Sequence, residues 1–118
     1  SIHLPVTKET TGMVNESWFA RMKDGAKLIN TARAAVVDQR AMLQALESGK
    51  LAGAAVDVMW IEPCPANHPF LSMEQVIVLP HQAGATVDID RWQSAMVLEE
   101  VKRFLAGQPL QNPFPRQA

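Results

Sequence analysis

Four charged or titratable side chains follow apolar segments of the chain: Arg33, Asp57, Glu62 and His81. Arg33 has small alanine neighbours, and a guanidinium in such surroundings can grip a carboxylate through two hydrogen bonds. His81 follows Pro80 after a hydrophobic run, in a good position for a proton donor near neutral pH. Together these residue types indicate a site that binds a carboxylate and transfers a proton.

The two acidic candidates suggest supporting roles, and each candidate also has a structural alternative. Asp57 stands in an otherwise apolar strand end, where a buried carboxylate needs a ligand or a hydrogen-bonding partner. Glu62 could orient a histidine, since a nearby carboxylate favours imidazolium. Alternatively, Arg33 could pair with Asp38, and Glu62 could lie in solvent. His81 could simply hydrogen-bond to backbone.

The remaining histidines and the cysteine have weaker patterns. His3 at a strand end could be only a loop hydrogen bonder, and His68 in a proline-rich loop suggests surface or packing. Cys64 lies between two prolines without an obvious activating base, and we interpret it as inert. The histidines lack metal-ligand spacing and there is no cysteine pair, so we predict no metal site.

Strands that alternate with helices must position these side chains. Hydrophobic runs predict strands over 2–4, 26–30, 54–58 and 76–79. Helical spacing, with capping residues and glycine stops, predicts helices over 16–23, 39–48 and 88–106. This alternation indicates an α/β fold with a parallel sheet. In such sheets ligands bind outside the carboxyl ends of the strands, where the four candidates fall.

Particular residues carry these element predictions. Asn15 and Asp38 are the expected N-caps of the first two helices, and Gly49 is the expected stop of the second. The longest helix, which Gly107 should end, has apolar residues at 3.6-type spacing. They are Ile89, Trp92, Met96, Val97, Val101, Phe104 and Leu105.

The composition of the 118-residue chain fits one compact domain, with 47% hydrophobic and 19% charged residues. A net charge of -1 gives no electrostatic reason to expect nucleic acid or a membrane surface as partner. No apolar run approaches the ~20 residues of a membrane span. A single cysteine excludes an intrachain disulfide, and we predict a reducing, cytoplasmic location.

Four ordered motifs run along the chain. They are His3-Leu-Pro-Val-Thr7, Gly25-Ala-Lys-Leu-Ile-Asn-Thr-Ala-Arg33, Gly49-Lys-Leu-Ala-Gly-Ala-Ala-Val-Asp57 with Glu62-Pro63, and Pro80-His-Gln-Ala-Gly-Ala-Thr86. With these motifs the chain resembles the D-isomer-specific 2-hydroxyacid dehydrogenases over essentially its whole length. The resemblance implies the C-terminal half of a Rossmann-type doubly wound parallel sheet, followed by a long helix. It also implies an NAD(P)-dependent oxidoreductase that interconverts 2-hydroxy and 2-oxo acids.

The resemblance further implies a role for each candidate. Arg33 matches the arginine that binds the substrate carboxylate, and His81 matches the acid/base that protonates the carbonyl oxygen during reduction. Glu62 matches the carboxylate that pairs with this histidine, and Asp57 matches the residue that contacts the nicotinamide carboxamide. Family positions that contact the dinucleotide, NAD or NADP, fall on His3, Pro5, Thr31, Arg33, Asp57, His81 and Gly84.

The chain departs from the family pattern in two ways. Ala34 stands where family members usually have glycine, which is tolerable if the backbone there is not left-handed. The glycine-rich phosphate loop and the acidic ribose binder would lie upstream of Ser1. We therefore expect 1–106 to be a partial NAD(P)-binding Rossmann domain whose N-terminal half is missing, and the isolated piece to be inactive. Residues 107–118 would be a C-terminal tail that returns toward the substrate domain.

Two other functions stay open. Corepressors of the C-terminal-binding-protein type resemble these dehydrogenases but act as non-enzymatic, nucleotide-regulated binding proteins. An isolated half-domain could instead serve as an interaction module through an exposed sheet edge. Formate dehydrogenases fit less well, because they carry glutamine where Glu62 stands. For the intact enzyme, the resemblance suggests a homodimer that acts on a small 2-oxo or 2-hydroxy acid.

Overall fold

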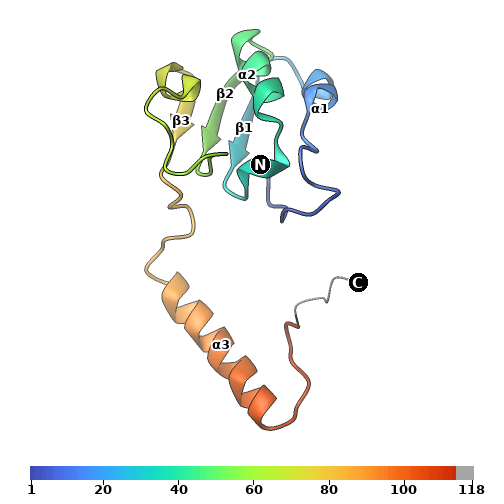
Figure 1. Ribbon diagram of the computed structural model, residues 1–118, viewed down its shortest axis with the longest axis vertical. Helices are drawn as coiled ribbons and strands as arrows, with labels where there is room; N and C mark the ends of the chain where they lie inside the picture. Colours follow the sequence, from blue (N-terminus) through green and yellow to red (C-terminus); the bar gives the residue numbers. More distant parts are fainter. Residues whose placement is uncertain (114–118) are drawn as a thin grey trace. The chain divides into compact units, whose positions relative to one another are not determined.

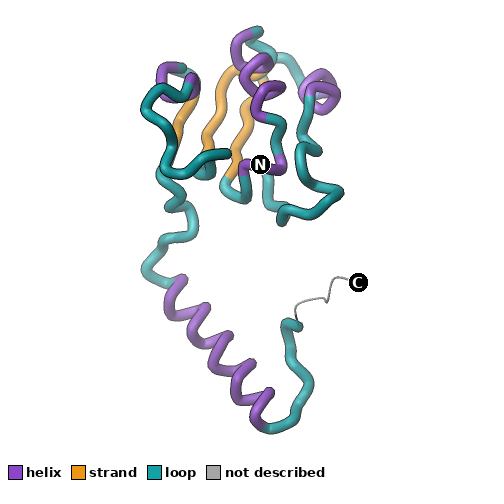
Figure 2. The backbone as a smooth tube through the Cα atoms, viewed as in Figure 1, coloured by secondary structure: helices purple, strands orange, loops and turns teal. Residues whose placement is uncertain are grey.

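The computed structural model describes residues 1–113 and divides into two compact units, Ser1–Ala83 and Gly84–Ala118. The first unit holds all the strands of the described chain, coloured orange in Figure 2. Its elements are α1 (Glu16–Arg21), β1 (Ala26–Asn30), the short 3-10 helix η1 (Ala34–Val36), α2 (Gln39–Glu47), β2 (Leu51–Val56), the 3-10 helix η2 (Pro69–Ser72) and β3 (Val76–Val78). The described part of the second unit holds α3 (Ile89–Leu105).

Within residues 1–113 the strands form one parallel sheet in the order β1-β2-β3 (Figure 1). Asn30 pairs with Val56, and Val56 pairs with Val78, so the three strands end level with one another. The predicted α/β architecture with a parallel sheet is confirmed. Because the strands are parallel and in register, the loops that follow all of them leave from one edge of the sheet.

The core of the first unit lies between the sheet and the helices. Met42 and Leu46 of α2 are buried against it, as the helical spacing predicts, and Phe70 of η2 is buried as well. The predicted N-caps are confirmed: Asn15 Oδ1 accepts from the backbone N–H groups of Ser17 and Trp18, and Asp38 accepts from Ala41 N. These caps define where α1 and α2 begin, and hence where the preceding loops end.

Several predicted boundaries were wrong. The helix predicted over 16–23 ends at Arg21, and the strand predicted over 54–58 runs from Leu51 to Val56. The strand starts early because Leu51 pairs with Ala26, a contact that local sequence does not reveal. The strand predicted over 2–4 is reduced to one parallel bridge from Ile2 to Asn30. The chain then turns away at Pro5, which has no N–H for a ladder.

The second unit contains the predicted long helix, and Gly107 ends it with a φ of 66°. None of the residues of α3 is buried, and Trp92 and Phe104 remain 70% and 73% exposed. The apolar spacing of α3 therefore does not correspond to a buried stripe within the described part of this unit. No helix within residues 1–113 combines the length and apolarity needed to cross a membrane.

Gly53 of β2 lies where a side chain would not fit. A Cβ there would be 2.8 Å from the backbone oxygen of Gln75, which also accepts a hydrogen bond from Ala54 N at 3.0 Å. The oxygen cannot retreat without loosening the β2–β3 pairing. We expect Gly53→Ala to lower the free energy of unfolding by about 1–3 kcal/mol, measured by urea denaturation.

Gly84→Ala is the matched control for this substitution. A Cβ at Gly84 meets no atom of the described chain within 4 Å, and its φ is not left-handed. Its effect is expected to stay within about 0.5 kcal/mol. Equal unfolding curves for Gly53→Ala and the wild type would show that β2 and β3 are not this close.

Candidate active site

All four candidates of the first unit follow strands at the carboxyl edge of the sheet. Arg33 lies between β1 and η1, and Asp57 directly follows β2. Glu62 belongs to the loop after β2, and His81 stands three residues beyond the end of β3. The parallel topology thus brings together side chains that lie up to 48 positions apart in the sequence (81 minus 33).

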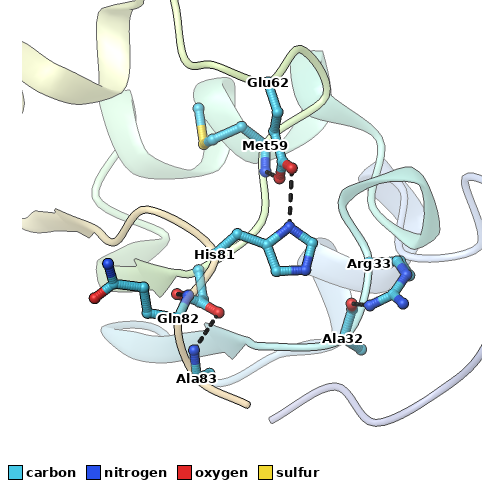
Figure 3. Close-up of polar contacts among 8 residues, drawn as sticks. Ala32, Arg33, Met59, Glu62, His81, Gln82 and Ala83 are labelled. Atoms are coloured by element: carbon cyan, nitrogen blue, oxygen red, sulfur yellow. Dashed lines mark hydrogen bonds and ion pairs between the residues drawn. The ribbon is translucent and has the colours of Figure 1, made fainter. Parts of the chain in front are cut away.

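His81 and Glu62 form the central contact of this edge. His81 Nδ1 and Glu62 Oε2 are 2.8 Å apart, and Glu62 Oε1 accepts from Met59 N at 2.9 Å (Figure 3). The hydrogen bond from His81, followed by the one from Met59, lowers the pKa of the Glu62 carboxyl. Glu62 is therefore ionised near neutral pH. The alternative in which it simply lies in solvent is wrong.

Arg33 makes no ion pair with Asp38 within residues 1–113, because Asp38 instead caps α2. Its Nη1 donates to the carbonyl of Ala32 at 2.6 Å. Ala34, the departure from the family glycine, has no left-handed backbone, so its methyl group causes no strain. Arg33 is exposed, and it lines the same pocket as His81.

Arg33, Glu62 and His81 line one pocket of about 230 Å³. The rest of its wall is mostly apolar and consists of Val6, Ala34, Ala35, Val58, Met59 and Trp60. A larger pocket of about 580 Å³ also touches Glu62 and His81 but lacks the arginine. Of these two pockets the smaller is the better candidate, because it brings an arginine together with the hydrogen-bonded pair of His81 and Glu62.

Asp57 is buried, with 2% of its surface exposed. Its two carboxylate oxygens accept hydrogen bonds from Gln82 N and Ala83 N, each at 2.7 Å. The sequence left open whether this carboxylate meets a ligand or a hydrogen-bonding partner within the protein. The structure shows the second, in the form of these two backbone amides. His81, just before these amides, has a φ of 56°, an uncommon left-handed conformation for a residue other than glycine.

The structure places the other predicted residues less completely. His3, Pro5 and Thr31 are exposed near the end of β1, where Ile2 forms its bridge with Asn30. Gly84 belongs to the second unit, so its contact with the dinucleotide stays a prediction. Within residues 1–113, no group of three His, Cys, Asp or Glu side chains could hold a metal ion.

Neither His68 nor Cys64 lines the smaller pocket, the arginine pocket, although Cys64 lines the larger one. His68 Nδ1 accepts from Phe70 N, and its ring packs edge-on against Phe70 at 4.9 Å, which agrees with the predicted packing role. Cys64 is half-buried.

Sequence reasoning missed the pocket residues Met59 and Trp60. Trp60 Nε1 donates to the carbonyl of Val37 at 3.0 Å, which fixes this loop beside the pocket. Both residues lie in an irregular segment without periodicity, so the only usable signal was their position between Asp57 and Glu62.

Residues 1–83 match the family model described as D-isomer specific 2-hydroxyacid dehydrogenase, NAD binding domain. The chain belongs to this family. The predicted family and its cofactor class, NAD or NADP, are therefore confirmed. The Rossmann-type fold expected for the sheet is confirmed with them.

Relatives in this 2-hydroxyacid dehydrogenase family include glyoxylate reductase of Thermofilum pendens, 43% identical over 108 residues, with 92% of this chain and 32% of that protein covered. D-3-phosphoglycerate dehydrogenase of Bacillus subtilis is 40% identical over 112 residues, with 95% of this chain and 21% of that protein covered. This chain therefore spans about a fifth to a third of the length of these relatives.

A solved structure of a D-isomer specific 2-hydroxyacid dehydrogenase from Xanthobacter autotrophicus Py2, in complex with NADPH and MES, has the same fold. It matches with a TM-score of 0.87 and 39% identity, over 95% of this chain and 46% of that chain.

The Glu62 contact predicts a specific pH dependence of stability for this dehydrogenase-family domain. The folded-state pKa of Glu62 lies below its ordinary value of 4.5, so the ionised contact stabilises the fold above pH 4.5. That stability is lost as the pH falls through the lower folded value. We expect Glu62→Gln to unfold at a lower temperature than the wild type near pH 6, with the difference shrinking steadily below pH 4.5.

Thermal denaturation from pH 6 to pH 3 at constant ionic strength measures this difference. Glu74→Gln is the matched control, since Glu74 is exposed and makes no side-chain hydrogen bond or ion pair in the described chain. A difference between Glu62→Gln and the wild type that does not change with pH would contradict a stabilising role for the carboxylate.

Proposed function

We propose that this chain is part of an NAD(P)-dependent oxidoreductase that interconverts a 2-hydroxy acid and a 2-oxo acid. The observation that carries the proposal is the shared pocket of Arg33, Glu62 and His81, which joins a carboxylate-binding cation to an acid–base pair. The glyoxylate reductase and phosphoglycerate dehydrogenase names of the relatives agree with a small acid as substrate.

Arg33 binds the substrate carboxylate and thereby orients the neighbouring carbonyl carbon. A guanidinium has five N–H donors, so one can remain on the Ala32 carbonyl while others meet the carboxylate. The mostly apolar wall around it strengthens this attraction, because it excludes part of the competing water. This anchoring converts a loose encounter into a fixed geometry for reaction.

His81 supplies the proton. Its Nδ1 faces Glu62, and no hydrogen bond engages Nε2 within residues 1–113, so Nε2 can meet the substrate oxygen. When bound, the reduced dinucleotide provides the hydride for the carbonyl carbon. Protonated His81 gives its Nε2 proton to the carbonyl oxygen, which leaves a neutral imidazole and the 2-hydroxy acid. In oxidation, the neutral ring takes the hydroxyl proton.

Glu62 supports this step without touching the substrate. Its carboxylate faces Nδ1 at 2.8 Å, which orients the ring and keeps Nε2 directed away from Glu62 (Figure 3). Met59 N in turn holds the other carboxylate oxygen at 2.9 Å. The two contacts of Glu62 therefore hold the His81 ring in a defined orientation.

Residues at the end of β1 suit a dinucleotide. His3, Pro5 and Thr31 are exposed, and the bridge from Ile2 to Asn30 brings their two segments side by side at the carboxyl edge. That edge is where α/β sheets bind nucleotides. With Arg33, Asp57 and His81 they form the proposed NAD or NADP contacts of the first unit. Gly84, in the second unit, is proposed as a contact on the family resemblance alone.

Three further proposals rest on the family resemblance alone. They are that the intact enzyme is a homodimer, that it is located in the cytoplasm, and that the isolated piece has no activity. The domain limits also stay a proposal: a partial Rossmann domain over 1–106 and a tail over 107–118 that returns toward the substrate domain. Part of this tail, 114–118, lies outside the described residues.

The test is a spectrophotometric assay of the complete polypeptide with NADH and NADPH on glyoxylate, hydroxypyruvate and pyruvate. We expect steady oxidation of at least one cofactor by at least one of these acids. Tight cofactor binding without turnover on any 2-oxo acid would contradict the proposal and favour the corepressor-type function.

A further inference from the structure

Two buried polar side chains stand at the carboxyl ends of neighbouring strands. Within residues 1–113, the polar or charged residues that are buried are Asn30, 1% exposed, and Asp57, 2% exposed. Asn30 ends β1 and Asp57 follows β2, and Asp57 N donates to the Asn30 carbonyl at 3.0 Å. Buried polar groups are costly unless their hydrogen bonds are made, so their partners indicate why they are there.

The partners of Asn30 are the backbone groups that carry Arg33. Asn30 Oδ1 accepts from Ala32 N at 3.0 Å, and its Nδ2 donates to the Arg33 carbonyl at 3.1 Å. An amide suits this place because one bond needs an acceptor and the other needs a donor. A carboxylate of the same shape would set an oxygen against the Arg33 carbonyl.

The partners of Asp57 are the backbone groups that follow His81. Both bonds need acceptors, because Gln82 and Ala83 each present an N–H to the side chain at 2.7 Å. On the other side of His81, Leu79 N donates to the Val56 carbonyl at 2.9 Å. The left-handed backbone of His81 is therefore held between two attachments to the end of β2.

We propose that Asn30 and Asp57 are matched positioning residues, of which Asn30 fixes the backbone that aims Arg33 and Asp57 fixes the backbone that aims His81. The inference rests on the proposed function for what the two aimed side chains do. Neither residue needs to touch the substrate. Each acts through the loop that it anchors, and its atom types match the backbone groups of that loop.

Exchanging the two atom types tests the proposal with little change in side-chain volume. Asn30→Asp replaces a donor by an acceptor opposite the Arg33 carbonyl, and Asp57→Asn replaces an acceptor by a donor opposite a backbone N–H. In the complete polypeptide we expect Asn30→Asp chiefly to raise KM for the 2-oxo acid, by about 10-fold or more. Asp57→Asn should chiefly lower kcat, by about 10-fold to 100-fold.

Hydrogen exchange gives a readout that does not depend on activity. The amides of Gln82 and Ala83 should exchange at least about 10-fold faster in Asp57→Asn than in the wild type. Asn30→Asp should leave these amides unchanged, which makes it the matched control. If Asp57→Asn fails to fold, the wild type alone still tests the anchor, because both amides should be protected about 10-fold or more relative to an unstructured peptide.

Several outcomes would contradict the proposal that Asp57 holds the loop after His81. Unprotected Gln82 and Ala83 amides in the folded wild type would overturn it. So would an Asp57→Asn variant whose kcat falls as expected while the Gln82 and Ala83 amides stay as protected as in the wild type, since Asp57 would then not act through this loop. The same kcat and KM pattern in both variants would show general destabilisation. If the wild type reduces no 2-oxo acid, the proposed function is contradicted. Hydrogen exchange then still tests whether Asp57 holds the backbone of Gln82 and Ala83.

Discussion

Replacing His81 by glutamine is expected to lower kcat for 2-oxoacid reduction by about 10²–10⁴-fold, the usual contribution of general acid–base catalysis. A glutamine amide can hydrogen-bond to a carbonyl oxygen but cannot give up a proton to it. Because the substrate carboxylate would still be held by Arg33, KM should change much less than kcat. Stopped-flow or steady-state NADH oxidation by the complete polypeptide measures both quantities.

His68→Gln is the matched control for this substitution. His68 is a histidine of the same unit that lies outside the arginine pocket and bonds to the backbone of Phe70. Its loss should change kcat by less than about 3-fold, although it should make the fold around η2 less stable. An equal loss of kcat in the two variants would show that histidine substitutions act through the fold. In that case His81 would not be the proton donor.

Replacing Arg33 by glutamine is expected to lower kcat/KM for a 2-oxo acid by about 10²–10³-fold. The physical basis is the loss of two charge-assisted hydrogen bonds, each worth about 1.5–3 kcal/mol, reduced here by the exposure of the side chain. Arg33→Lys should recover only part of this, because an ammonium keeps the charge but not the two-pronged geometry.

A neutral substrate separates carboxylate binding from other effects of this substitution. The wild type and Arg33→Gln should reduce the methyl ester of the same 2-oxo acid at similar rates, since the ester lacks the charge that we propose Arg33 to bind. Arg40→Gln is the matched control, because it removes the charge of an exposed arginine on α2. It should leave the preference for the free acid over the ester unchanged. If Arg33→Gln lowers ester and acid reduction equally, Arg33 does not bind the carboxylate.

Local sequence predicted the elements of this chain well because their signals are local. The caps Asn15 and Asp38 accept hydrogen bonds from amides two or three residues away. Gly49 and Gly107 end their helices through a positive φ, which depends on the residue itself and not on distant contacts. The alternation of strands and helices then left few topologies other than a parallel sheet. Strand ends were less certain, because they depend on pairing with a distant partner.

The family also came from the sequence, through the order of its motifs. Arg33, Asp57, Glu62 and His81 are each ambiguous alone, but their succession resembles one dehydrogenase family, and the match over residues 1–83 confirms that family. Composition contributed little beyond a globular class, because a near-neutral chain is compatible with many functions.

Only the tertiary structure decided how the polar groups are paired. Asp57 and its amide partners at 82 and 83 are 25 and 26 positions apart, and Glu62 and His81 are 19 apart. The sequence likewise could not decide whether Asp38 pairs with Arg33 or caps α2, because this depends on the conformation of the loop between them. Hydrogen bonds act over about 3 Å, whereas sequence patterns report only on near neighbours, so contacts between the ends of separate strands become defined only when the sheet aligns them.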